Sequence, residues 1–152
     1  MSKISKFSFL VLCGVISSNA FSAMPKGMPE PYMNECASCH TAYAPRFLNQ
    51  NNWKNITTTL DKHFGTDASI DAKTVEEITK WLIKNAATKG GSAEYSLDNR
   101  ITSKSWFKSE HDEVSAAEWK RPSIKSPSNC MACHIQANAG IFDEDSVRIP
   151  KK

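Results

Sequence analysis

The sequence lacks any long run of basic residues, and its charge is nearly balanced. It contains 19 Lys and Arg against 16 Asp and Glu, which gives a formal net charge of +3 at pH 7. No five consecutive positions are basic. Because nucleic-acid-binding proteins carry clustered positive charge, the chain shows no footprint of that function.

Two kinds of hydrophobic pattern are also missing. No segment alternates apolar and polar residues for long enough to predict a β-strand. After residue 23, no stretch approaches the roughly 20 consecutive apolar residues that a transmembrane helix requires. We therefore expect little or no sheet and no membrane span in the mature chain.

Cysteine and histidine are scarce, and most of them fall in two copies of the pattern C-x-x-C-H. The chain has five cysteines and four histidines. The pattern is typical of covalent attachment of a c-type haem. Cysteines three positions apart lie one helical turn from each other, so both thiols reach the two vinyl groups on one porphyrin edge. The histidine that follows is the proximal ligand of the iron. The residues concerned are Cys36, Cys39 and His40 in the first copy, and Cys130, Cys133 and His134 in the second.

Other functions of paired cysteines fit less well. A zinc ribbon places its two pairs roughly 15–20 residues apart, whereas Cys36 and Cys130 are 94 positions apart. A disulfide framework suits a small exported protein, and a thioredoxin-like dithiol needs a βαβ setting that is absent around Cys36. None of these alternatives explains a histidine directly after both pairs. The sequence therefore predicts two covalently bound haem c groups.

The two remaining histidines, His63 and His111, are the candidate distal ligands. Both lie among apolar residues, where a histidine is more often an ordinary core residue. Here two irons each need a sixth ligand, and two histidines are spare once His40 and His134 are assigned. This count favours bis-histidine ligation of both haems. Chain order suggests His63 for the first haem and His111 for the second, with the crossed arrangement left open.

Methionine is the competing distal ligand. Met24, Met28 and Met33 lie in a proline-containing lead-in before or at the first motif. Met131 lies between the two cysteines of its own motif and points away from that iron. Two imidazoles leave the reduction potential lower than a histidine and a methionine would.

The start of the chain predicts export. The apolar segment at 7–16 follows Lys3 and Lys6 and precedes a run of small residues, which is typical of a secretory signal peptide over residues 1–22. About ten apolar residues are too few to span a bilayer. Cys13 lies inside this segment and is set aside with it. Because bacteria attach haem c outside the cytoplasm, we expect a periplasmic protein without a membrane span after processing.

Apolar spacing predicts a mostly α fold, in which short helices and loops wrap around two haems. Roughly 65 residues per haem means that the porphyrins form much of the core. We expect one lobe at 23–92 around the first haem and another at 93–152 around the second, within one compact domain. The predicted helices cover 34–43, 52–64, 71–87, 105–114 and 128–140.

Four segments together resemble the dihaem cytochrome c family: ECASCHTAYAPRFL, NWKNITTTLDKHFGTDASID, ITSKSWFKSEHDEV and SPSNCMACHIQANAGIFDEDSVRIP. The resemblance covers about residues 32–150. It implies a mostly helical, two-lobed fold of the small c-type multihaem kind. It also implies an electron carrier, not an enzyme, that takes electrons from a membrane cytochrome b and passes them to a small high-spin monohaem cytochrome c. Carried over by position, it implies haem attachment at the four motif cysteines, proximal ligation by His40 and His134, and distal ligation by His63 and His111.

Two other functions remain alternatives. One is the small dihaem subunit of a periplasmic nitrate reductase, which has a similar size and is also bis-histidine. The other is a haem enzyme or ligand sensor with one open iron site, in which His63 or His111 is detached. The nitrate-reductase subunit would co-purify with a molybdenum-containing partner. Carbon monoxide identifies the enzyme or sensor, because it binds only an iron with an open position.

Overall fold

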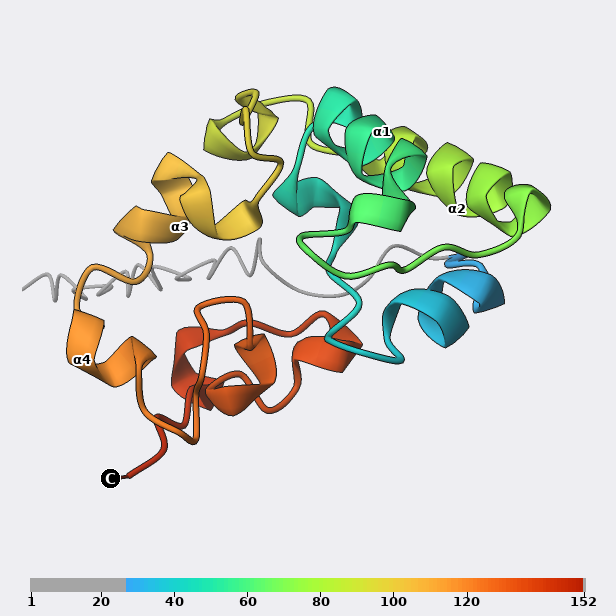
Figure 1. Cartoon of the computed structure of the whole chain (residues 1–152). Coiled ribbons are helices and arrows are strands. Elements are labelled where there is room, and N and C mark those ends of the chain that lie inside the picture. The colour runs from blue at the N-terminus through green and yellow to red at the C-terminus, as the bar shows by residue number, and fades with distance from the viewer. Residues whose placement is uncertain (1–26, 152) are drawn as a thin grey trace, which may run out of the picture.

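The computed structural model describes residues 27–151, and that part of the chain is helical with no β-strand. Only isolated bridges pair backbone segments there, for example between Asn49 and Ala87. The predicted signal peptide at 1–22, with Cys13, and also Met24 lie outside the described residues. No helix between residues 27 and 151 is both long and apolar enough to cross a membrane. The mostly α fold predicted from the sequence is confirmed (Figure 1).

The helical elements are short and joined by loops. The α-helices are α1 (Gln50–Thr58), α2 (Ala72–Asn85), α3 (Ser105–Ser109) and α4 (Ala116–Trp119). One π-helical turn, η1 (Tyr32–Cys36), precedes them. The 3₁₀ turns are η2 (Pro45–Phe47), η3 (Leu60–Lys62), η4 (Gly91–Ala93), η5 (Ile101–Ser103), η6 (Cys130–Ala132), η7 (Ala137–Ala139) and η8 (Glu144–Ser146).

Helix α2 follows the sequence prediction most closely. The apolar spacing at 71–87 predicts a long helix, and the structure has one at Ala72–Asn85. Asp71 caps it, because its side chain accepts a hydrogen bond of 3.0 Å from the backbone of Thr74. The helix therefore begins next to the predicted start at residue 71.

The helix predicted at 34–43 is wrong in its bounds. The structure is helical over 30–36, and the rest of the first motif follows as a turn. Pro31 lies in the first turn of this helix. Proline is tolerated there because backbone N–H groups in the first turn make no hydrogen bond within the helix. The first cysteine of the motif therefore ends the helix, and His40 lies beyond it.

The helix predicted at 52–64 is divided in two. Helix α1 ends at Thr58, η3 follows, and His63 comes directly after η3. Three consecutive threonines, Thr57 to Thr59, lie at the end of α1. Each side-chain hydroxyl donates a hydrogen bond to a backbone carbonyl four residues earlier. Such bonds compete with the regular helical ladder. His63 is consequently positioned by the turn after η3 and not by the face of a continuous helix.

The two helices predicted in the second half are also shorter than expected. The segment 105–114 is helical only as far as Ser109, so His111 lies in the turn after α3. The segment 128–140 consists of η6 and η7 with a turn between them. Helices of three to five residues are not stable by themselves, so neighbouring segments determine where they end.

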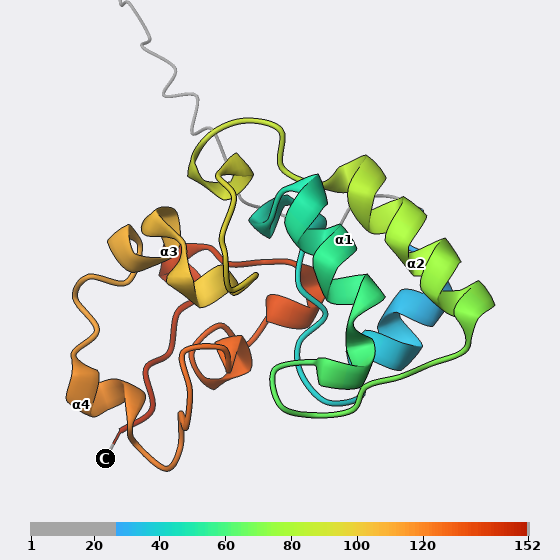
Figure 2. The same cartoon turned by 45° about the horizontal axis from the view of Figure 1, so that its top comes forward.

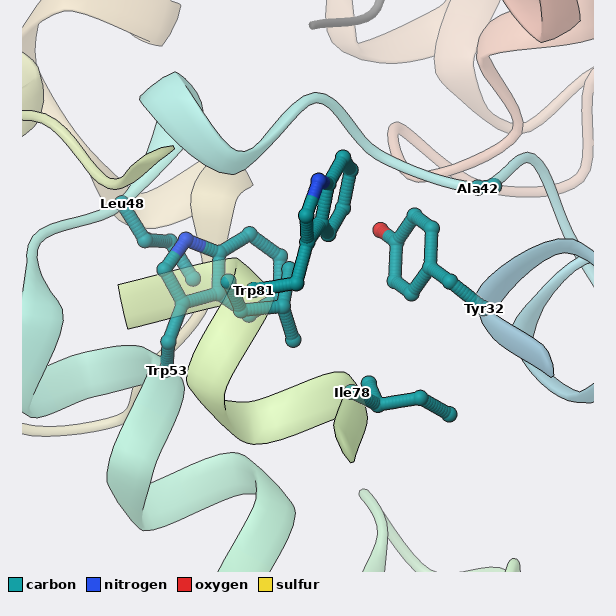
Figure 3. Packing of buried hydrophobic residues seen from close by; sticks show 7 residues of the cluster. Tyr32, Ala42, Leu48, Trp53, Ile78 and Trp81 are labelled. Carbon is teal, nitrogen blue, oxygen red and sulfur yellow. The ribbon is translucent and has the colours of Figure 1, made fainter. Parts of the chain in front are cut away.

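A hydrophobic core forms where α1 and α2 pack beside η1 (Figures 1 and 3). The rings of Tyr32 and Trp81 lie 4.9 Å apart. The indole of Trp53 donates a hydrogen bond of 2.6 Å to the carbonyl of Pro45, which satisfies its buried N–H. The buried cluster consists of Tyr32, Ala42, Leu48, Trp53, Ile78, Trp81 and Leu82.

The C-terminal quarter is held together by long-range hydrogen bonds instead of regular elements. Backbone positions 133–134 pair with 147–148, with one hydrogen bond of 2.9 Å. The guanidinium of Arg121 donates to the carbonyl of Pro150 at 3.0 Å. These bonds place the second haem motif against the end of the chain. The lobe boundaries at 23–92 and 93–152 stay a prediction.

Candidate haem-binding sites

A cavity of about 340 Å³ contains all four side chains predicted to hold the first haem: Cys36, Cys39, His40 and His63. It lies among η1, α1, α2 and the segment 99–102. Its apolar wall includes Tyr32, Leu48, Trp53, Ile56, Ile78 and Leu82. An apolar cavity with a few converging polar groups is the usual form of a cofactor site.

The imidazoles of His40 and His63 face each other across this cavity. Their ring centroids are 6.1 Å apart and their planes are inclined by only 17°. A histidine nitrogen lies roughly 2 Å from a metal that it binds. Two imidazoles on opposite sides of one metal ion therefore have centroids about 6 Å apart. The spacing of His40 and His63 fits one iron between them.

The other two histidines form a second pair with the same spacing. The centroids of His111 and His134 are 6.0 Å apart, but their planes are inclined by 75°. The structure thus brings His63 to His40 and His111 to His134, in the order that the chain suggests. The crossed arrangement would need His63 beside His134, and the structure places them in separate pairs.

Hydrogen bonds orient one imidazole in each pair. The Nδ1 atom of His40 lies 2.7 Å from the carbonyl oxygen of Thr41, and Nδ1 of His111 lies 2.8 Å from the carbonyl oxygen of Phe107. A carbonyl oxygen only accepts, so Nδ1 must carry the proton in both rings. The neutral ring then has its lone pair on Nε2, the atom left free to bind iron.

The partner imidazoles are held in their neutral form. Burial lowers the pKa of His63, with smaller contributions from His40 and Arg100. Burial likewise lowers the pKa of His134, with a smaller contribution from His111. The Nδ1 atom of His134 is buried and has no hydrogen-bond partner among residues 27–151. Such an atom is usually satisfied by a bound group or an ordered water.

The four motif cysteines are free thiols in the structure. Burial raises the pKa of both Cys36 and Cys130 to about 11, so a free thiol at either position stays neutral. Within the described part of the chain, no three His, Cys, Asp or Glu side chains converge as a metal site would require. The zinc-ribbon and disulfide alternatives therefore find no matching geometry.

Aromatic side chains surround the second histidine pair. The ring of His111 stacks on Phe107 at 4.2 Å and lies 5.8 Å from Trp119, and His134 lies 5.3 Å from Phe142. Neither Trp119 nor Phe142 is among the residues that the sequence predicts for this site. A signal for Trp119 was present, because Ser115 begins an S-x-x-E capping box that starts α4 and positions this tryptophan.

Tyr43 connects the two sites. Its ring stacks on His40 with a centroid separation of 4.8 Å, and its hydroxyl donates a hydrogen bond of 2.7 Å to the carbonyl of Ser128. Cys130 lies on the wall of the first cavity. A second hollow is lined jointly by residues of both motifs, including Cys39 and Met131. The two haem motifs are therefore adjacent in space.

Comparisons with known proteins agree with this geometry. A family model described as dihaem cytochrome c matches residues 32–142. A diheme cytochrome type c from Shewanella baltica OS155 is 37% identical, with 80% of this chain and 92% of that chain covered and a TM-score of 0.70. A diheme cytochrome c from Rhodobacter sphaeroides is 32% identical, with 80% and 100% covered and a TM-score of 0.69. Among curated proteins, none matches the chain. The chain therefore belongs to the dihaem cytochrome c family, whose members carry two covalently attached haem c groups.

Proposed function

We propose that this protein is a bis-histidine dihaem cytochrome that relays electrons between redox proteins and transforms no substrate. The observation that carries the proposal is the pair of imidazole separations, 6.1 Å for His40 and His63 and 6.0 Å for His111 and His134. Both match the distance needed to hold one iron from two sides. Each haem, once bound, supplies a one-electron couple at its iron.

The chain's own residues have two tasks at each haem. Cys36 and Cys39 would form the thioether bonds of the first haem, and Cys130 and Cys133 would form those of the second. Each histidine pair would hold one iron between its two imidazoles and so would exclude water and small ligands. Neither site would then bind a substrate at the metal.

Tyr43 keeps the two sites together. It stacks on an imidazole of the first pair and hydrogen-bonds the segment that carries the second motif. Adjacent haems suit a carrier, because an electron that enters at one site can leave from the other. The docking partners of such a carrier form small, transient interfaces.

We further propose a periplasmic location, with a membrane cytochrome b as electron donor and a small high-spin monohaem cytochrome c as acceptor. The predicted signal peptide at 1–22 supports the location, and the family resemblance supports the partners. No described feature favours the nitrate-reductase subunit. Stopped-flow mixing of the reduced protein with a high-spin monohaem cytochrome c tests the acceptor, and slow, salt-independent transfer would contradict it.

Carbon monoxide tests the ligation. When it is added to the reduced protein, we expect no immediate change in the visible spectrum. The variants His63→Ala and His111→Ala are the positive controls, and each should bind carbon monoxide at one haem only. An immediate change in the unmodified protein, stoichiometric with one haem, would overturn the proposal and favour the enzyme or sensor alternative.

A further inference from the structure

Arg100 lies at the rim of the first haem cavity and is the only Lys or Arg among the residues that the structure shows lining it. Its guanidinium carbon lies 4.3 Å from the centroid of the Phe64 ring. That ring in turn meets the imidazole of His63 edge-on at 4.8 Å. A single positive charge therefore lies beside one candidate iron ligand.

The backbone of Phe64 and Gly65, next to Arg100 in space, has an unusual conformation. Phe64 has a φ of 51°, in the left-handed region that a bulky side chain rarely adopts, and Gly65 after it has a φ of 98°. Backbone of this kind costs free energy and persists where the surrounding structure requires it. In this conformation the phenyl ring, which is 44% exposed, lies under the guanidinium as a cation–π platform.

Arg100 forms no ion pair among residues 27–151, where the two ion pairs are Glu76–Lys80 and Glu118–Arg121. Its charge does act on Asp98, because it helps to lower the pKa of that carboxyl. Asp98 accepts a hydrogen bond of 3.0 Å from the backbone N–H of Arg100, not from its side chain. The carboxylate of Asp98 is otherwise bound by the hydroxyls of two serines.

Haem c would supply carboxylates with which the guanidinium of Arg100 can form an ion pair. A porphyrin carries its vinyl groups toward one edge and its two propionate carboxylates toward the opposite edge. Cys36, at the end of η1, and Cys39, just after it, would hold the vinyl edge of the first haem. Arg100 lines the same cavity, and Figures 1 and 2 both show η1 (blue) and the yellow segment around residue 100 on opposite sides of α1. A haem held by these cysteines would extend its propionates away from η1, toward the side where that segment lies.

We propose that the guanidinium of Arg100 binds a propionate of the first haem and thereby raises the reduction potential of that haem. The pairing is favourable because a carboxylate at the mouth of an apolar cavity needs a charge-assisted partner. Arginine suits this task because its fork binds a carboxylate with two hydrogen bonds. The inference rests on the proposed placement of the first haem at Cys36, Cys39, His40 and His63.

The effect on potential follows from charge. A ferric haem has one more positive charge than a ferrous haem, so an uncompensated propionate stabilises the ferric form. Removing the charge of Arg100 should therefore lower the potential of the first haem. The second haem should respond little, because its histidine pair does not lie on this cavity.

The test is a spectroelectrochemical titration of the Arg100→Gln variant with both haems attached. At a fixed applied potential, we expect the ferrous-to-ferric ratio of one haem to fall about tenfold, a shift of about 59 mV. Arg100→Lys keeps the charge and should fall less than about threefold. Lys62→Gln is the matched control, since it removes a charge next to His63 that does not lie on the cavity wall, and it should change neither ratio by more than about twofold.

Three results would overturn the inference. In the first, Arg100→Gln changes the reduction potential of the first haem no more than Lys62→Gln does. In the second, Arg100→Gln shifts the potentials of both haems equally. In the third, Arg100→Lys lowers the potential of the first haem as much as Arg100→Gln does. If Arg100→Gln assembles poorly, Arg100→Met replaces it in the same titration, because it also removes the charge while keeping an unbranched side chain, and the same fall of about tenfold is expected. The carbon monoxide test is independent, so a failure of bis-histidine ligation is distinguishable from a failure of the Arg100 pairing.

Discussion

The ring planes of His111 and His134 are turned by 75° at a centroid separation of 6.0 Å, whereas His40 and His63 are nearly parallel at 17°. Local contacts set this difference. His111 is held by the carbonyl of Phe107 and by stacking on the Phe107 ring, one helical turn earlier. His40 is held by its neighbouring carbonyl and by a tyrosine ring. The two candidate haem sites thus have equal spacing but different orientation of their ligands.

Electron paramagnetic resonance of the oxidised protein should distinguish the two sites. Parallel imidazole planes separate the energies of the two iron d orbitals that accept π density, and perpendicular planes leave these energies nearly equal. We expect two low-spin signals of equal intensity, one rhombic from the His40–His63 site and one strongly anisotropic from the His111–His134 site. The His111→Ala variant should lose only the anisotropic signal. Two identical rhombic signals would contradict the assignment.

Tyr43→Phe tests the connection between the motifs. The change removes the hydrogen bond of 2.7 Å to the carbonyl of Ser128 and leaves the ring stacked on His40. We expect the free energy of unfolding, measured in urea, to fall by about 1 kcal/mol. The matched control is Tyr95→Phe, because Tyr95 is 53% exposed. Removing its hydroxyl should change the free energy of unfolding by less than about 0.5 kcal/mol. Equal effects of the two variants would show that the Ser128 contact contributes nothing.

Asn52→Ala tests the buried polar network that supports the segment around Arg100. The Asn52 amide is fully buried, donates to the carbonyl of Ser96 at 2.6 Å and accepts from the Ser96 N–H at 3.2 Å. The ammonium of buried Lys104 lies 3.5 Å from the amide oxygen of Asn52. Truncation leaves the Ser96 N–H without its partner, whereas the Ser96 carbonyl still accepts from the backbone of Asn99 and the Lys104 ammonium still donates to the carbonyl of Glu94. We therefore expect a loss of about 2 kcal/mol in the free energy of unfolding.

Asn55→Ala is the control for that prediction. Asn55 lies on the same helix one turn later, and its side chain makes longer hydrogen bonds of 3.2 and 3.3 Å in a more exposed setting. Its truncation should cost less than about 1 kcal/mol. If both variants lose the same amount, the stability of the segment does not depend on the buried amide.

Asp98 should make stability depend on pH in the acid range. Burial by itself raises the pKa of this carboxyl, but hydrogen bonds from Ser103, Ser96 and the backbone of Arg100 lower it to about 2. A pKa below the unfolded value of about 3.9 means that the stabilisation is present above about pH 4 and is lost as the pH falls toward 2. Urea unfolding should show Asp98→Asn less stable than the unmodified protein at pH 7, with the difference shrinking between pH 4 and pH 2.

A comparison with Asp112→Asn completes the pH experiment. Asp112 is exposed and makes no hydrogen bond or ion pair with any described residue. Its replacement should change the free energy of unfolding by less than about 0.5 kcal/mol at pH 7. A pH-independent stability difference for Asp98→Asn would show that the serine hydroxyls do not hold the ionised form.

The sequence predicts the chemistry of the sites better than their local structure. Cys36 and Cys130 begin motifs whose spacing reflects covalent geometry, and such spacing does not depend on the rest of the fold. Helix α2 is also predictable, because its 14 residues give a complete apolar face and Asp71 caps it. The pairing of His63 with the first motif and His111 with the second follows chain order, and the structure brings the same residues together.

The short elements could not be predicted in the same way. The π turn that ends at Cys36 and the 3₁₀ turns after Thr58 are too short for a periodic pattern to define them. Tertiary contacts decide where such elements end. The relation of Tyr43 to Ser128 and the approach of Arg100 to Phe64 join segments that are distant in the chain, so a single sequence does not reveal them.

The hydrogen bond from Tyr43 to Ser128 joins residues that are 85 positions apart. Closing so long a loop costs conformational entropy before any contact repays it, and the buried cluster around Trp53 and Trp81, within residues 27–151, is small. We therefore expect haem attachment to be a precondition for compaction of the chain. A host cell that cannot attach haem c should yield little of this polypeptide, because the open chain would be cleared by proteases.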